Sequence, residues 1–152
     1  MVEFREITEM DIKRLCADAR PEDVAEVAAS TIKDFESAVR QSVADSEWSL
    51  CAFCGDDLLC VFGIGNINIL SGTGAPWLLG TNKIKAHKKA FWKGSVEVVE
   101  WMKERIDTLE NHVHARNKPS IAWLKRLGFT VESSAIDGLN GEKFLRFYLC
   151  VQ

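Results

Sequence analysis

The stretch that most constrains the fold runs from Asn111 to Phe129 and reads as a strand, a turn and a short helix. Asn117 is placed to cap the helix, because its side chain can accept a hydrogen bond from a first-turn amide. Pro119 is tolerated in that first turn, where an amide has no partner within the helix. Gly128 supplies a left-handed residue after the last turn. These signals predict a strand–turn–helix unit that leads into a new strand at Phe129.

Length and charge set the broad class of the chain. Its 152 residues predict a single domain over 1–152 that is long enough to bury a core. A net charge of −3 makes nucleic-acid binding an unexpected function. No apolar run reaches the roughly 18–20 residues that span a bilayer, so no membrane association is expected. The N-terminal residues lack the charged-then-apolar pattern of an export signal, which favours a cytoplasmic protein.

Five cysteines cannot all pair within one chain, and this also favours a reducing compartment with free thiols. Cys51 and Cys54 form a C-x-x-C motif, and Cys60 follows closely. A structural zinc site would need four ligands, and no second motif supplies them. The pattern favours small buried residues in two adjacent strands, and no metal site is expected.

The first third of the chain has helical periodicity after an initial strand at 2–7. Thr8 opens a helix, with Asp11 three residues later in the manner of a capping box. Pro21 begins a second helical segment that extends to about Val43 and has one break near Asp34. The 3.6-residue pattern places its inner face on these residues: Val24, Val27, Ala28, Thr31 and Ile32.

The middle of the chain changes to the two-residue period of strands. Residues 48–54 and 58–70 predict an antiparallel hairpin, and Gly63 and Gly65 in its second arm indicate a bulge or a close backbone approach. Pro76–Leu79 is a short apolar strand of the kind found near the centre of a sheet.

A long helix is predicted from about Asn82 to Arg105. The strand Leu109–Ala115 follows this helical crossover and is therefore expected to be parallel to Pro76–Leu79. Residues 130–136 and 144–151 predict a closing hairpin. The order β-α-α-β-β-β-α-β-α-β-β predicts a mixed α/β fold, with a largely antiparallel sheet of about seven strands and helices on both faces.

This element order, together with the pattern N-x-x-x-x-x-x-L-x-x-x-G-F from Asn117 to Phe129, resembles the GNAT superfamily of N-acetyltransferases. The strand–Asn–helix–Gly-Phe stretch is similar to motif B of that family. More narrowly, PWLLGT and the run ENHVHARNKPSIAWLKRLGF resemble a phage branch of the fold, which includes the internal virion protein A of short-tailed phages and its prophage relatives.

The resemblance implies that acetyl-CoA binds between two splayed parallel strands, here Pro76–Leu79 and Leu109–Ala115. Its pyrophosphate would lie at the start of the long helix, in the segment 80–89, and Asn117 would lie beside the pantetheine arm. A strand amide near Leu78–Leu79 would stabilise an oxyanion. The implied cofactor-binding residues are Leu78, Leu79, Gly80, Thr81, Lys83, Lys85, Lys88 and Asn117.

The segment 80–89 carries four lysines and His87 in the expected first turns of a helix. Cations there oppose the helix dipole, at a cost of roughly 0.3–1 kcal/mol each when exposed. Two interpretations remain open. The lysines form a solvated basic face, or an anion such as a CoA phosphate binds both the lysines and the unpaired amides.

Acyl transfer to an amine requires a base that removes a proton from the ammonium group. His112 and His114 alternate with Val113 and share one face of their strand, so either is a candidate base. Glu110 lies on the same face and could orient His112. The competing interpretation is a hydrogen-bonded structural histidine that faces a helix layer.

Two departures from the family pattern keep two functions open. The chain has GTNKIKAHKKAF where motif A would have Q/R-x-x-G-x-G/A, and Leu124 stands where many members have a tyrosine acid. The first function is an enzyme that acetylates an amine of a small molecule or protein. The second is a non-catalytic phage or prophage protein that contacts phage or host proteins, in the host cytoplasm or the virion. Proteins of this fold are often dimers, so a homodimer is a further expectation.

Overall fold

The computed structural model describes residues 1–151. The strands are β1 Val2–Arg5, β2 Ser46–Cys54, β3 Asp57–Asn68, β4 Thr73–Gly80, β5 Thr108–His114, β6 Thr130–Asp137 and β7 Lys143–Cys150. The α-helices are α1 Glu9–Asp18, α2 Pro21–Ser30, α3 Phe35–Asp45, α4 Lys88–Lys103 and α5 Lys118–Arg126. Two short 3-10 helices are η1 Asn82–His87 and η2 Leu139–Gly141.

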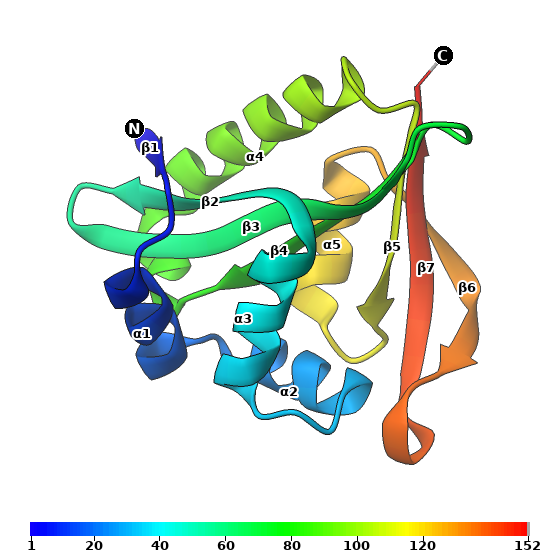
Figure 1. Ribbon diagram of the computed structural model, residues 1–152, viewed down its shortest axis with the longest axis horizontal. Helices are drawn as coiled ribbons and strands as arrows, with labels where there is room; N and C mark the ends of the chain where they lie inside the picture. Colours follow the sequence, from blue (N-terminus) through cyan, green and yellow to red (C-terminus); the bar gives the residue numbers. More distant parts are fainter. Residues whose placement is uncertain (152) are drawn as a thin grey trace.

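Within the described residues, the strands form one seven-stranded sheet in the order β1-β2-β3-β4-β5-β7-β6 (Figure 1). Every neighbouring pair is antiparallel except β4 and β5, which run parallel. The helical crossover through α4 explains this exception, because parallel neighbours cannot be joined by a tight turn. The expected mixed and largely antiparallel sheet is therefore confirmed.

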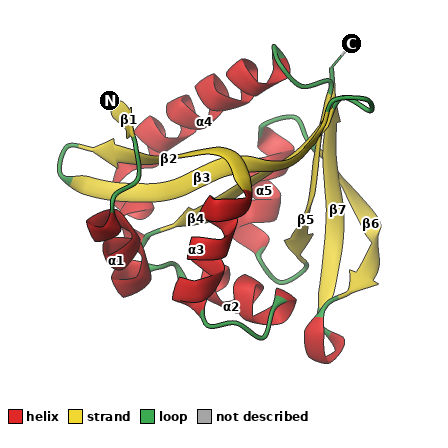
Figure 2. Cartoon of the chain, in the orientation of Figure 1, coloured by secondary structure: helices red, strands yellow, loops and turns green. Residues whose placement is uncertain are grey.

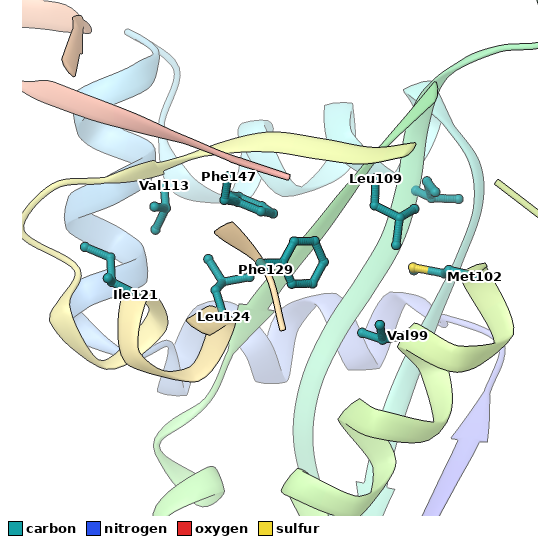
Figure 3. Close-up of a cluster of buried hydrophobic side chains, with 9 residues drawn as sticks. Val99, Met102, Leu109, Val113, Ile121, Leu124, Phe129 and Phe147 are labelled. Carbon is teal, nitrogen blue, oxygen red and sulfur yellow. The ribbon is translucent and has the colours of Figure 1, made fainter. Parts of the chain in front are cut away.

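Helices cover both faces of the sheet (Figure 2). On one face, α1 and α3 pack Ile12, Leu15 and Val39 against buried residues of β2 and β3. On the other face, α4 and α5 cover a second cluster, in which Leu109 is fully buried (Figure 3). The members of that cluster are Ile64, Val99, Met102, Leu109, Val113, Ile121, Leu124, Phe129 and Phe147. The core is thus two apolar layers, one on each side of the sheet.

Several local predictions are confirmed. Thr8 and Asp11 form the reciprocal capping box at the start of α1. Asn117 caps α5 by accepting a hydrogen bond from the Ser120 amide, and Gly128 follows the helix with a φ of +103°. At Gly63 a Cβ atom would lie 2.6 Å from the Trp48 carbonyl oxygen, so only glycine allows this close backbone approach.

The second N-terminal helical segment is divided in two. Asp34 ends the irregular link after α2 and caps α3 by accepting from the Ser37 amide, so the break expected near Asp34 separates two helices. The predicted inner face of this segment is right only in part. Val27 packs against the core cluster under α1 and α3, but Val24 and Ile32 are exposed and Asp23 is buried instead. The helix is turned so that a carboxylate faces the sheet, because that carboxylate finds hydrogen-bond partners there.

The central helix begins later than predicted. Residues 82–87 form the 3-10 helix η1, and α4 starts at Lys88. Thr81 explains the earlier turn, because its side chain accepts from the Lys83 amide while Ile84 packs into the core. Lys83 and Lys85 therefore lie before the α-helix rather than in its first turn, and Lys88 is its first residue.

No helix formed by the described residues is long and apolar enough to cross a membrane. Cys51 on β2 and Cys60 on β3 are buried in adjacent strands, as expected, and all five cysteines are free thiols. Among residues 1–151, no group of three or more His, Cys, Asp or Glu side chains is placed to hold a metal ion.

Candidate active site

The parallel strands β4 and β5 separate soon after they begin. Backbone pairing joins Thr73 to Thr108 and Gly74 to Leu109, and the register contains no further pair between these strands within the described residues. Each strand remains held on its outer side, β4 by β3 and β5 by β7. The centre of the sheet therefore opens at the C-terminal ends of two strands whose positions are fixed by their other neighbours.

A side chain spans the opening where the pairing stops. Asn111 Nδ2 donates to the Pro76 carbonyl oxygen at 2.9 Å. Backbone amides alternate in direction along a strand. The Thr81 amide donates to the Leu59 carbonyl oxygen of β3, so the amides of Gly80 and Leu78 point the other way, into the opening. Leu78 is thus the first residue after Pro76 that directs a backbone donor between β4 and β5.

A cavity of about 550 Å³ passes through this opening and reaches both helix layers. Its wall is mostly apolar, with side chains from both splayed strands and from α4 and α5. Residues of β4 and β5 in the wall are Pro76, Trp77, Leu78, Leu79, Asn111, His112 and Val113. Glu26 and Ser30 of α2 and Asp137 of β6 contribute the polar part on the opposite face of the sheet. An apolar slot with a few polar groups is the usual form of a small-molecule site.

The far ends of β4 and β5 are joined through α2 rather than to each other. Asp23 is 1% exposed and accepts from the Gly80 amide of β4 at 2.7 Å. The guanidinium of Arg20 donates to both oxygens of the same carboxylate. A buried carboxylate is stable only when its charge and its oxygen atoms have such partners.

Glu26, one helical turn later, makes the matching contact with β5. Its Oε1 accepts from the His114 amide at 2.8 Å. Asn117 Nδ2 lies 3.3 Å from Oε1 of Glu26 and 3.3 Å from Oδ1 of Asp23, so it donates to both carboxyl groups. Burial raises the pKa of Glu26, and the charge of Asp23 raises it further, whereas the bond from the His114 amide lowers it. Burial is the largest of these effects, so the pKa of Glu26 is raised relative to an ordinary glutamate.

The two predicted histidines lie in different environments. His112 is exposed and lines the cavity. His114 is 3% exposed, and its ring packs against Phe144 at 5.3 Å between centroids. Its Nε2 lies 3.5 Å from Oε1 of Glu142 and makes no hydrogen bond with any residue between 1 and 151. Of the two, only His112 lies on the cavity wall.

Glu110 has a different partner from the one predicted. Its Oε2 accepts from the guanidinium of Arg146 on β7, with Nε at 3.1 Å. The carboxylate is therefore engaged across the β5–β7 pair and does not orient His112. The prediction that Glu110 supports His112 is wrong, because a guanidinium one strand away offers a charge-assisted hydrogen bond.

The predicted phosphate segment offers side chains rather than free strand amides. Lys83, Lys85, Lys88 and Lys89 are all exposed. The Gly80 amide donates to Asp23 and the Thr81 amide to the Leu59 carbonyl, so both amides already have partners. The first turn of α4 has no side-chain cap, because His87 makes no capping hydrogen bond. A phosphate at this segment would therefore meet the lysine side chains and the start of α4 rather than the amides of Gly80 and Thr81.

Two aromatic rings close the space between α4 and α5 beside the cavity. Phe91 and Trp123 are stacked with centroids 5.7 Å apart, and Trp123 Nε1 donates to Ser95 Oγ at 3.2 Å. Leu124, at the position of the family tyrosine, is 5% exposed in the apolar cluster and offers no proton. The side chains of this wall thus shape the slot without adding an acid.

Sequence reasoning missed Asp23 and Glu26. Acidic residues in the first turns of a helix have a sufficient local explanation, because they favour the positive end of its dipole. The available signal was their three-residue spacing, which places both on one face of α2. Asn117 was found, but its amide bridges these two carboxyl groups. The role of Asn117 beside a pantetheine arm stays a prediction.

Comparisons with known proteins agree with this geometry at the level of the fold. A spermidine N-acetyltransferase from Vibrio cholerae, solved with CoA and spermine, has a TM-score of 0.72 at 9% identity, over 98% of this chain and 95% of its own. The chain has the GNAT fold. RimL, a ribosomal L7/L12 alpha-N-protein acetyltransferase solved with CoA, has a TM-score of 0.71 at 13% identity, over 99% and 94%. A Bacillus subtilis acetyltransferase in complex with CoA has a TM-score of 0.66 at 18% identity, over 99% and 98%.

Sequence comparison adds no closer assignment. No family model matches the chain, and no curated protein matches it either. The similarity to GNAT acetyltransferases is therefore a similarity of structure.

Proposed function

We propose that the protein is an N-acyltransferase that transfers acetyl from acetyl-CoA to an amine of a small molecule or protein. The observation that carries this proposal is the separation of β4 from β5, which opens an apolar slot with the Leu78 amide directed into it. Three GNAT-fold neighbours were solved with CoA, which supports the same class of donor here.

Each part of the slot has a role in such a reaction. When bound, acetyl-CoA would supply the acyl group as a thioester. The Leu78 amide stabilises negative charge on the acyl oxygen, because a fixed donor in a dry site needs no reorganisation. The apolar wall excludes water, and the exposed lysines around the start of α4 attract phosphate groups.

The acceptor is proposed to approach from the α2 side of the sheet, where Glu26 and Asp137 line the cavity. Carboxyl groups there suit a cationic amine. The named substrates of the neighbours, spermidine and the N-terminus of a ribosomal protein, are both amines. A panel of spermidine, small primary amines and peptide N-termini therefore covers the proposed class.

Calorimetric titration with acetyl-CoA and CoA tests the donor site first. Binding in the micromolar range is expected, and no binding at millimolar ligand would exclude the proposal. Release of the CoA thiol on the amine panel then measures turnover.

Variants at position 78 test the amide donor itself. Leu78→Pro removes the amide that faces the slot, and a loss of about 10²–10³-fold in kcat is expected. Leu78→Ala is the matched control, because it shortens the same side chain and keeps the amide. Equal activity of the two variants would show that the Leu78 amide has no part in the reaction.

A second candidate is a non-catalytic phage or prophage protein that keeps the fold for virion assembly or host interaction. The Phe91–Trp123 stack favours it, since the rings fill the space between α4 and α5 next to the slot. This candidate rests otherwise on the resemblance of PWLLGT and the Asn111–Phe129 run to the phage branch. Co-purification with virions or a host protein, without CoA binding, would support it. Turnover that disappears in Leu78→Pro would count against it.

A further inference from the structure

A polar network fills the end of the opening between β4 and β5, and all of its acidic groups come from α2. Asp23 binds the last residue of β4, and Glu26 binds the last residue of β5. Asn117, 2% exposed, lies between the two carboxyl groups and donates to each. The network holds α2 against both strand ends, so its groups have fixed positions relative to the slot.

The carboxyl groups of Asp23 and Glu26 differ in whether an oxygen is left without a hydrogen bond. Both oxygens of Asp23 are engaged, by Arg20, the Gly80 amide and Asn117. Glu26 uses only Oε1, and its Oε2 makes no hydrogen bond with the described part of the chain. Glu26 also lines the cavity, whereas Asp23 does not. One oxygen of Glu26 is therefore free to meet a ligand in the slot.

We propose that Glu26 is the general base of the acyl transfer, and that its Oε2 accepts a proton from the ammonium group of the acceptor. This inference rests on the proposed function, since it names the base for that reaction. The position suits the role. The His114 amide holds Glu26 at the end of β5, and Glu26 and Leu78 line the same cavity, so the free oxygen of Glu26 shares the slot with the oxyanion donor.

The step balances without another reactant. Glu26 takes one proton from the ammonium group, and the freed nitrogen lone pair forms the C–N bond to the acyl carbon. The C–S bond breaks and its electron pair leaves on sulfur. The second proton of the nitrogen ends on that sulfur, which gives the free thiol and the amide. Glu26 returns its proton to solvent before the next turnover.

The groups around Glu26 raise its pKa, which suits a general base. Burial raises its pKa, which makes the carboxylate a stronger base than an exposed glutamate. The charged groups around it are Asp23 and Arg20 at the start of α2, and the Asp23 charge raises the pKa further. His112 of β5 and Asp137 of β6 also line the cavity, and the Asp137 carboxylate is paired with Lys143. His114 contributes its backbone amide, which holds Oε1.

Steady-state kinetics of three variants test the assignment. Glu26→Gln keeps an oxygen for the His114 amide and removes the base, so a loss of about 10²–10⁴-fold in kcat is expected, with acetyl-CoA affinity retained. Glu22→Gln, on the same helix outside the network, is the matched control and keeps wild-type activity. Asp23→Asn removes the neighbouring charge, so the acid limb of kcat/KM moves to lower pH.

A structural role for Glu26 would not give this pattern. The assignment is overturned if Glu26→Gln keeps activity within about threefold of wild type, or if its acid limb is unchanged. Loss of activity in His112→Asn with Glu26→Gln unaffected would assign the base to His112 instead.

A carboxyl NMR titration separates this proposal from the proposed function. If the wild-type protein has no turnover on the amine panel, the acyltransferase proposal fails. The titration then still decides Glu26. A pKa above the ordinary glutamate range that falls when spermidine is added supports an amine held at Oε2. An ordinary pKa, or one that spermidine leaves unchanged, overturns the assignment.

Discussion

The two sides of the β4–β5 opening are built from opposite chemistry. Toward α4 and α5, Leu109, Val113 and Leu124 belong to an apolar cluster (Figure 3). Its side chains are held by close packing and need no specific donor or acceptor. Toward α2, Asp23 and Glu26 hold the strand ends through hydrogen bonds, and each bond has a defined donor and acceptor. A sheet that opens leaves backbone groups unpaired, and the α2 side shows how they are satisfied.

This difference has an energetic consequence. Apolar burial loses stability gradually, in proportion to the volume removed. A buried charged network loses more from one change, because each removed partner leaves another polar group unpaired in a dry environment. The α2 side should therefore be the more fragile of the two, and the predictions below measure that contrast.

The largest effect is expected for Asp23→Ala. The change leaves Arg20 without its carboxylate and the Gly80 amide without an acceptor, so the free energy of unfolding should fall by about 3–5 kcal/mol. Urea unfolding monitored by tryptophan fluorescence measures this.

Two variants calibrate the Asp23 result. Asp23→Asn keeps an oxygen acceptor and loses only the charge, so its effect should be smaller than that of alanine. Glu22→Ala, on the same helix outside the network, should change stability by less than about 0.5 kcal/mol. If Asp23→Ala were as stable as Glu22→Ala, the network would not hold the strand ends.

The apolar side is also the side that the sequence predicts. Apolar residues at helical and strand spacing identify α4, α5 and β5 because burial follows from periodicity alone. Asn117, Pro119 and Gly128 fix the ends of α5 because capping depends only on residues close in the chain. These features could be predicted because their causes are local.

The polar side depends on residues far apart in the sequence. Asn117 contacts Asp23 and Glu26 across more than ninety positions. Nothing local distinguishes these acids from Glu22, which also occupies the start of α2. The hydrophobicity of Val24 predicts an inward position, but the hydrogen bonds of Asp23 turn the helix the other way. Lys83 and Lys85 lie outside the predicted first turn of the α-helix, because the Thr81 side chain favours a 3-10 turn before the helix.

A smaller loss is expected on the apolar side from Leu109→Ala. Leu109 is fully buried on β5, and removing its side chain leaves a cavity between the sheet and α4. The free energy of unfolding should fall by about 3 kcal/mol. Leu70→Ala is the control, since Leu70 is fully exposed and should change stability by less than about 0.5 kcal/mol. A loss at Leu109 larger than that of Asp23→Ala would reverse the proposed order of the two sides.

The smallest effect concerns the pH dependence of stability, and Glu26→Gln isolates it. The pKa of Glu26 is raised in the folded protein, chiefly by burial, so the folded state holds this proton more tightly than the unfolded state. The resulting stability is fully present below the unfolded value of about 4.3 and is lost as pH rises through the folded pKa. Glutamine does not titrate, so the variant loses no stability at this position over that pH range.

The variant should therefore gain stability relative to wild type as pH rises from acid to neutral. Urea unfolding of both proteins at a series of pH values measures the difference. Glu22→Gln should not gain stability relative to wild type as pH rises, because the change leaves Glu26 in place. A difference that stays constant from acid to neutral pH would mean that Glu26 is no harder to ionise than an exposed glutamate. Ionisation of Glu26 would then not lower the free energy of unfolding, and only Asp23 would distinguish the α2 side from the apolar side of the opening.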